Sequence, residues 1–180
     1  FNTTGVKNSA FGRFSLRQNL VGNNNSAFGY KSLYNNVTNN NSAFGYLALA
    51  NNTSGSGNSA FGHLSLASNT SGINSAFGYK SLTSNTSGSG NSAFGYQSLA
   101  SNTTGNYNTA IGNKALKNNT IGGSNTAVGE QALRDNTTGS SNVAFGLQAL
   151  VVNTIGANNT AVGYASMLLN TGGTKNVAIG

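Results

Sequence analysis

Few side chains in this sequence can carry out acid–base, nucleophilic or metal chemistry. The 180 residues include one histidine, His63, and two carboxylates, Glu130 and Asp135, and they contain no cysteine. A catalytic or metal site needs several such groups in one place, and calcium-binding β-roll repeats need an Asp in every coil. We therefore expect His63 and both carboxylates to lie on the surface, and we predict no catalytic residue, no metal, no cofactor and no enzymatic activity.

The charged residues are few and mostly positive. Lysine and arginine number nine against the two acids, so the net charge is +7 although charged residues are only 6% of the chain. This balance permits weak attraction to an anionic polymer or surface. The charges are spread along the sequence and do not form one basic patch with interleaved aromatic residues, so we expect no specific binding of nucleic acid. No apolar run approaches the roughly 18 residues of a membrane span.

Tyrosine recurs at one phase of the sequence and is the residue type here best suited to ligand binding. Each of these tyrosines directly follows a glycine, and His63 occupies the same position in its own stretch. The column consists of Tyr30, Tyr46, Tyr79, Tyr96 and Tyr164. Since sugar rings stack on aromatic rings, this Tyr column is a candidate ligand face for a glycan or another polymer.

The tyrosines belong to a repeat that fills the chain. We call the glycine that closes each Asn-x-Ala-x-Gly unit the marker glycine. The marker glycines are Gly12, Gly29, Gly45, Gly62, Gly78, Gly95, Gly112, Gly129, Gly146, Gly163 and Gly180. They are 16 or 17 residues apart, and a period this short predicts an all-β parallel β-solenoid of about eleven coils, with residues 1–180 as one array. We also expect the chain to be part of a longer array, because both ends fall inside a repeat.

Two columns of asparagine accompany the marker glycines. The first Asn column comprises Asn8, Asn25, Asn41, Asn58, Asn74, Asn91, Asn108, Asn125, Asn142, Asn159 and Asn176. The second comprises Asn19, Asn36, Asn52, Asn69, Asn85, Asn102, Asn119, Asn136, Asn153 and Asn170. An amide both donates and accepts hydrogen bonds, so asparagines stacked at the strand spacing of about 4.8 Å are predicted to form ladders along the array.

Between the Asn columns, the pattern suggests two short extended segments joined by a turn near the marker glycine. The Phe column lies in the first segment: Phe11, Phe28, Phe44, Phe61, Phe77, Phe94, Ile111, Val128, Phe145, Val162 and Ile179. The Leu column lies in the second: Leu16, Leu33, Leu49, Leu66, Leu82, Leu99, Leu116, Leu133, Leu150 and Met167. We expect the Phe and Leu columns to fill the coil interior, with Ala, Gly and Ser on surfaces of close approach. The opposite assignment is the alternative.

The remainder of each repeat reads as a turn-rich loop. Two repeats are one residue shorter than the others, at Asn40 and Ile73, where a loop tolerates a deletion without a change in strand register. The same loops carry the Thr column: Thr53, Thr70, Thr86, Thr103, Thr120, Thr137, Thr154 and Thr171. A flat file of threonines resembles the faces of β-solenoid ice-binding proteins, and an ice-binding face is therefore one alternative function.

The stretches 142–146, 159–163 and 176–180 resemble the head repeat of trimeric autotransporter adhesins. The longer unit is also similar to repeats of bacterial surface proteins and phage tail-fibre-like proteins. This resemblance implies a left-handed parallel β-roll, often with three chains around one axis, located outside the cell and used for adhesion or as a fibre shaft. The repeat here is longer than that of the adhesin heads, and Phe and Leu stand where those heads have smaller residues.

Together these patterns lead to one functional expectation and its alternatives. We expect an extracellular structural repeat protein, at the cell surface or in a virion fibre, that forms the shaft or head of an adhesin. Its first partner is expected to be itself, as a trimeric fibre or a head-to-tail filament, because one coil has more apolar surface than it can hide. A host surface, a glycan or an anionic polymer is the second expected partner.

Overall fold

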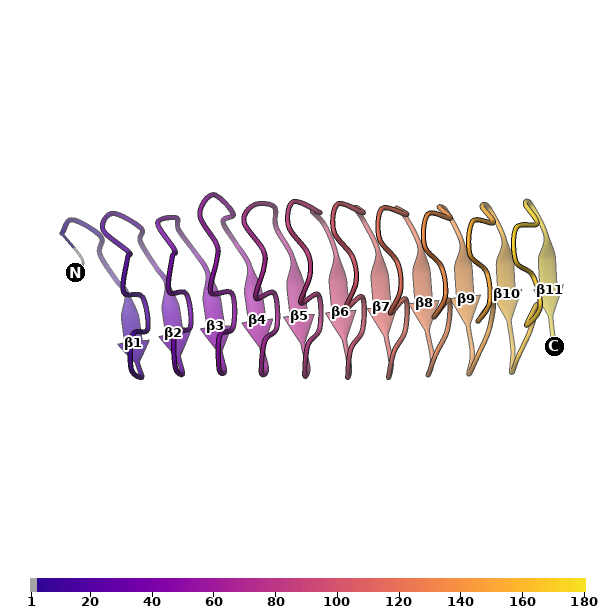
Figure 1. Ribbon diagram of the computed structural model, residues 1–180, viewed down its shortest axis with the longest axis horizontal. Helices are drawn as coiled ribbons and strands as arrows, with labels where there is room; N and C mark the ends of the chain where they lie inside the picture. The colour runs from indigo at the N-terminus through magenta and orange to yellow at the C-terminus, as the bar shows by residue number, and fades with distance from the viewer. Residues whose placement is uncertain (1–2) are drawn as a thin grey trace.

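The computed structural model describes residues 3–180, in which eleven strands form one continuous sheet. The strands are β1 (Ser9–Phe11), β2 (Ser26–Phe28), β3 (Ser42–Phe44), β4 (Ser59–Phe61), β5 (Ser75–Phe77), β6 (Ser92–Phe94), β7 (Thr109–Ile111), β8 (Thr126–Val128), β9 (Val143–Phe145), β10 (Thr160–Val162) and β11 (Val177–Ile179). Each strand pairs in parallel with the next one in the chain, so the sheet runs along the array (Figure 1). Residues 3–180 contain no helix, and hence none that could cross a membrane. The predicted all-β parallel β-solenoid is confirmed.

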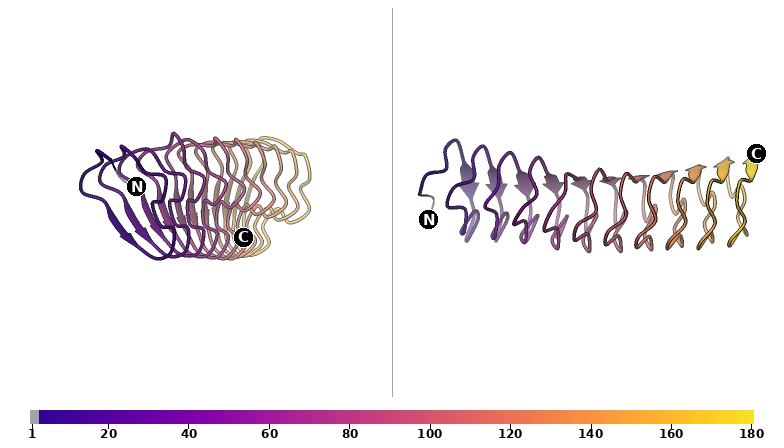
Figure 2. Two further views of the ribbon diagram at one scale, coloured as in Figure 1. Left: turned by 60° about the vertical axis from the view of Figure 1, so that its left-hand side comes forward. Right: turned by 90° about the horizontal axis from the view of Figure 1, so that it is seen from above.

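Each coil has two layers, and only one of them is a sheet. The strand layer lies opposite a turn layer, formed by the residues between the marker glycine and the second Asn column, and Figure 2 shows the sheet rotating gradually about the long axis. In the seventh coil the Ala115 amide donates to the Gly112 carbonyl, and four residues further the Asn119 amide donates to the Leu116 carbonyl. Lys114 and Leu116 have φ angles of 57° and 50°. The predicted second extended segment is therefore wrong, because successive tight turns replace it.

The turn layer is stable because each coil supports the next. The Leu99 amide donates to the Ala115 carbonyl and the Ser101 amide to the Lys117 carbonyl, both at 3.0 Å. A left-handed backbone at a non-glycine residue costs of order 1–3 kcal/mol, so contacts with neighbouring coils must outweigh local preference at every leucine of the column. Sequence pattern alone does not reveal such positions.

The apolar part of the coil interior is built from alanine and leucine. Ala110 in the middle of β7, Leu116 and Ala115 all have zero exposure, and the same three columns are buried through the central coils. The Leu column is thus interior as predicted, but the Phe column is not, since Phe28 and Phe94 are 38% and 39% exposed. Side chains alternate across a strand, so an inward alanine forces its neighbours outward. The inward alanines and the Leu column are fully buried in one cluster, which leaves no room for a Phe in place of the alanine.

Shortening of two loops leaves the sheet undisturbed. Ser26 pairs with Ser42 across the first short repeat, and Ser59 pairs with Ser75 across the second, in the register found elsewhere. The missing residues fall in the loops at Asn40 and Ile73, away from the strands. The prediction that these deletions are absorbed by loops is confirmed.

Candidate binding surface

The two Asn columns form the predicted ladders inside the array. In the first, each asparagine Oδ1 accepts the backbone N–H of the asparagine one coil later, at 2.8–3.0 Å. In the second, the Nδ2 group donates to the Oδ1 atom of the preceding coil, as from Asn136 to Asn119 at 2.7 Å. Of the ladder asparagines, 18 are at most 2% exposed. The ladders therefore hold the coils together and present no ligand face over most of their length.

A loop carbonyl ties the two ladders to each other. The oxygen of Gly105 accepts from Asn91 Nδ2 at 2.8 Å and from Asn102 Nδ2 at 3.0 Å. A methyl group on Gly105 would lie only 2.4 Å from the Asn102 Oδ1 atom. No buried side-chain nitrogen or oxygen among the described residues lacks a hydrogen-bond partner. Because every one of these buried polar atoms has a hydrogen-bond partner, an interior that is rich in amides is stable.

The Tyr column forms an aromatic stack at the turn that follows the strands. Ring centroids are 5.4 Å apart between Tyr30 and Tyr46, and 5.0 Å between Tyr46 and His63. Tyr79 and Tyr96 continue the stack at 5.2 and 5.3 Å. Each inner ring face is covered by the next ring, so the stack offers ring edges rather than the open faces on which a sugar would lie.

Tyr164 does not belong to this stack. Asn113, Glu130 and Leu147 occupy the equivalent positions between it and Tyr96. Tyr164 is 71% exposed, whereas Tyr96 is 47% exposed. The structure therefore brings together four of the five predicted tyrosines, with His63 among them.

The Phe column forms an apolar stripe on the outside of the strand layer. From Phe28 to Phe94, five rings stack at centroid distances of 4.6–4.8 Å and are nearly parallel. Ile111 and Phe145, which are 43% and 57% exposed, extend the stripe toward the C-terminal end. A continuous exposed apolar stripe is typical of an interaction surface.

The Thr column uses its hydroxyl groups within the array. From Thr70 onward, each Oγ1 donates to the carbonyl of the threonine in the next coil, at 3.0–3.1 Å. The same carbonyls also accept backbone N–H groups, as Thr120 does from Thr103 at 2.8 Å. Because the hydroxyl hydrogens are engaged in this way, they are not available to order water, and no observation favours the ice-binding alternative.

Positively charged and aromatic side chains lie close together in the first two coils. The Arg13 and Arg17 guanidinium carbons lie 4.6 and 4.9 Å from the ring centroid of Phe14, and that ring makes an edge contact with Tyr30 at 6.1 Å. The Lys31 Nζ atom lies 5.4 Å from the rings of both Tyr30 and Tyr34. We call these six residues the basic–aromatic cluster. Interleaved cations and rings are therefore present in the first two coils, contrary to the sequence-based expectation.

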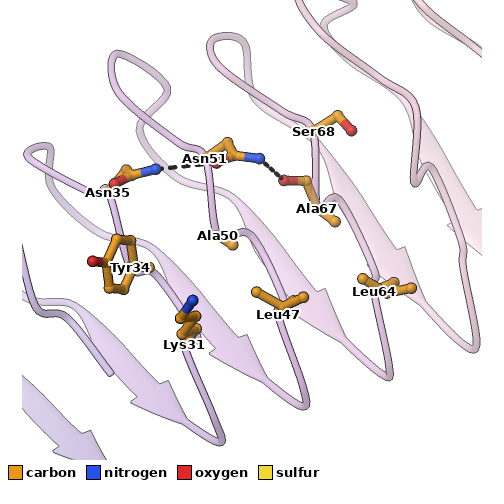
Figure 3. Close-up of a pocket in the computed structure, with 9 residues that line it drawn as sticks. All are labelled: Lys31, Tyr34, Asn35, Leu47, Ala50, Asn51, Leu64, Ala67 and Ser68. Carbon is orange, nitrogen blue, oxygen red and sulfur yellow. Dashed lines mark hydrogen bonds between the residues drawn. The ribbon is translucent and has the colours of Figure 1, made fainter. Parts of the chain in front are cut away.

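An open groove adjoins this cluster on the turn layer (Figure 3). Its volume is about 370 Å³, and it extends over the coils of β2, β3 and β4. Tyr34 and Lys31 form one end wall, and Ala50 and Ala67 occupy the positions in the next two coils that Tyr34 occupies in its own. The groove exists because a large side chain is followed by two small ones in the same column. That departure from the repeat is the signal by which the sequence could have revealed it.

The two acidic residues lie far from this groove, in the coil of β8. The Asp135 carboxylate accepts hydrogen bonds from Arg134 Nε at 2.8 Å and from Asn118 Nδ2 at 3.0 Å. The hydrogen bond from Arg134 is the main cause that lowers the pKa of Asp135, and the same bond raises the pKa of Arg134. Asp135 is consequently charged and paired at neutral pH.

Comparisons with protein-family models, with curated proteins and with solved structures found no match to this chain. Within residues 3–180, no three His, Cys, Asp or Glu side chains gather in a way that could hold a metal ion. The surfaces that remain as functional candidates are the apolar stripe of the Phe column and the basic–aromatic cluster with its groove.

Proposed function

We propose that this chain is a structural array that serves outside the cell, at the cell surface or in a virion fibre, as the shaft or head of an adhesive fibre, without enzymatic activity. The observation that carries this proposal is the unbroken stacking of eleven strands in register, reinforced by two buried Asn ladders. A solenoid whose coils bind only their neighbours is a stiff rod that can space or present other parts of a molecule. The resemblance of the repeat to adhesin heads supports the same role.

Self-association is part of this proposal. The Phe column is exposed or half-buried along the array, and its rings from Phe28 to Phe94 stack in one row that an identical row could cover. Burying apolar area is favourable by about 25 cal/mol per Å², so such a stripe favours lateral contact between copies. A trimer around a common axis and a head-to-tail filament are the two arrangements that we propose.

Replacing one ring of the stripe is expected to disrupt the assembly. In Phe61→Lys, a charge enters the middle of the apolar row, so the mass of a trimer held by this stripe should fall toward the 18.2 kDa of one chain. A head-to-tail filament does not use the stripe and should keep its mass. Light scattering on both proteins at micromolar concentration measures the change, with circular dichroism as a check on folding. Ser68→Lys, which adds the same charge on the turn layer, is the matched control and should leave the assembly intact. A wild-type protein that is already monomeric would contradict self-association.

Adhesion is tested separately with beads that carry the array. Beads coated with the wild-type protein should be retained on host cells or extracellular matrix more than beads coated with albumin. Equal retention would contradict a role as an adhesive head, whereas the role of a shaft would then depend on the assembly experiment alone.

A further inference from the structure

The groove beside Tyr34 has the features of a ligand site at a single place in the array. In other coils the position of Tyr34 holds smaller or charged residues, and no other described coil pairs a tyrosine there with a lysine three residues before it. Ala50, only 5% exposed, and Ala67 give the groove an apolar floor. Among residues 3–180, no aromatic ring contacts Tyr34, so its ring does not belong to a stack like that of the Tyr column. The groove can therefore offer an apolar surface to a ring of the ligand.

The charge at the groove favours an anion. The Lys31 ammonium group is held over Tyr34, and residues 1–129 contain no Asp or Glu that could neutralise it. Arg13 and Arg17 add positive charge in the neighbouring coil. An anionic group that approaches Lys31 thus meets no competing carboxylate of the protein.

The rim of the groove is lined with amides. Asn35 Nδ2 donates to Asn51 Oδ1 at 3.0 Å, and Asn51 Nδ2 donates to the Ala67 carbonyl at 2.9 Å (Figure 3). Each of these amides uses one of its two N–H bonds and keeps the second for a ligand. Ser68 adds a hydroxyl group at the far end. Such a rim suits a ligand that carries several hydroxyl groups.

We propose that this groove binds an acidic sugar unit of a polysaccharide, which goes beyond the role of a shaft. The carboxylate of the sugar pairs with Lys31, the apolar face of its ring covers Ala50 beside Tyr34, and its hydroxyl groups bond to Asn35, Asn51 and Ser68. Three coils span about 10 Å at the strand spacing, the length of two linked pyranose rings. Single-stranded nucleic acid is disfavoured because it needs open aromatic faces for successive bases, and the Tyr and Phe columns cover most of their own ring faces.

The test uses the full chain and a tetramer of galacturonic acid as the probe, in isothermal titration calorimetry. Lys31→Gln and Tyr34→Ser should each weaken binding at least tenfold. Lys80→Gln is the matched control, because Lys80 also lies over a tyrosine, Tyr79, at 5.3 Å, in a coil that has Thr83 at the position of Tyr34. This control should stay within twofold of wild type, and a neutral tetramer of galactose should bind at least tenfold more weakly than the acidic one.

Four results would overturn the proposal. The first is no binding of the acidic tetramer at millimolar concentration, and the second is equal binding of the neutral tetramer. The third is an equal loss of affinity in Lys31→Gln and Lys80→Gln. The fourth is tighter binding of a single-stranded oligonucleotide of equal charge that displaces the sugar. Equal losses would mean that diffuse charge attracts the sugar. Circular dichroism of each variant keeps loss of folding separate from loss of binding. None of these results depends on whether the array assembles, so this proposal and the proposed function fail independently.

Discussion

Asn108→Asp is expected to destabilise the array strongly at neutral pH and much less in acid. Asn108 Oδ1 accepts from the backbone N–H and the Nδ2 group of Asn125, at 3.0 and 3.1 Å, and a carboxylate oxygen can keep both bonds. Asn108 Nδ2 donates to Asn91 Oδ1 at 3.2 Å and to the Gly122 carbonyl at 2.9 Å. In the variant a second carboxylate oxygen would face these two acceptors inside the protein. We expect a loss of about 4 kcal/mol or more in the free energy of unfolding at pH 7.

The pH dependence of this variant has a definite sign. Burial and the two facing oxygens disfavour the charged form, so the pKa of Asp at this position rises above its unfolded value of about 3.9. A protonated Asp can donate to the Gly122 carbonyl, so the loss is smallest below the unfolded pKa and grows as the pH rises through the folded pKa. Urea denaturation of variant and wild type at pH 3 and pH 7 measures the difference between the two proteins.

Asn108→Ala is the matched control for the charge. It removes both donated bonds and leaves the backbone N–H of Asn125 without an acceptor, while Asn125 Nδ2 keeps only its bond to the Gly139 carbonyl. Its cost should therefore be similar at both pH values. If Asn108→Asp lost the same stability at pH 3 as at pH 7, the interior would be more open to water than the ladders indicate.

Gly95→Ala is expected to have an effect of similar size for a steric reason. Gly95 has a φ of 137°, and a methyl group there would lie 2.5 Å from the carbonyl oxygen of Gly112 in the next coil. Both the strained backbone and the contact with a neighbouring backbone must be relieved by separating two coils. We expect the free energy of unfolding to fall by at least about 4 kcal/mol.

Gly57→Ala separates the two contributions to this loss. Gly57 also has a positive φ, 75°, but a methyl group there meets only Ile73 Cγ2, at 3.7 Å. Its cost should be near the 1 kcal/mol typical of left-handed strain alone, about a quarter of that at Gly95. Denaturant midpoints of the two variants measure the ratio. Equal losses would show that close approach of the coils contributes nothing.

The fold was largely predictable from the sequence because it depends on columns. Asparagines recur in every repeat at the positions of Asn108 and Asn119. When identical amides stack, the N–H group of one can donate to the oxygen of the next, so a ladder is the expected arrangement. The marker glycines fix the coil length, and the short loops at Asn40 and Ile73 identify the part that can vary. Strand alternation was less informative, because it states that Ala110 and Ile111 face opposite ways without stating which faces inward. The packing of the strand alanines against the Leu column decides that question, and it is a tertiary property.

The candidate site was harder to predict because it departs from the repeat. Tyr34 is the single tyrosine of its column, and Lys31 shares its column with Lys80 and Lys114, so only the pairing of the two residues is unusual, and column averages hide it. Arg13 and Phe14 are adjacent in sequence, yet Phe14 meets Tyr30 only because consecutive coils stack. The turn layer could not be predicted from the sequence either, because Leu116 has a φ of 50° whereas leucine prefers a negative φ. In both cases the information lies in contacts between coils.

The buried amides also bear on how stability changes with temperature. Exposure of apolar surface on unfolding raises the heat capacity by about 0.45 cal/K/mol per Å², whereas exposure of polar surface lowers it by about 0.26. Here much of the buried side-chain surface belongs to 18 asparagines, and most of the rest to alanine and leucine. The heat-capacity change per residue should therefore fall below the usual value of about 12–15 cal/mol/K. A small heat-capacity change flattens the stability curve, so the stability of the array should differ little between temperatures close to freezing and physiological temperature.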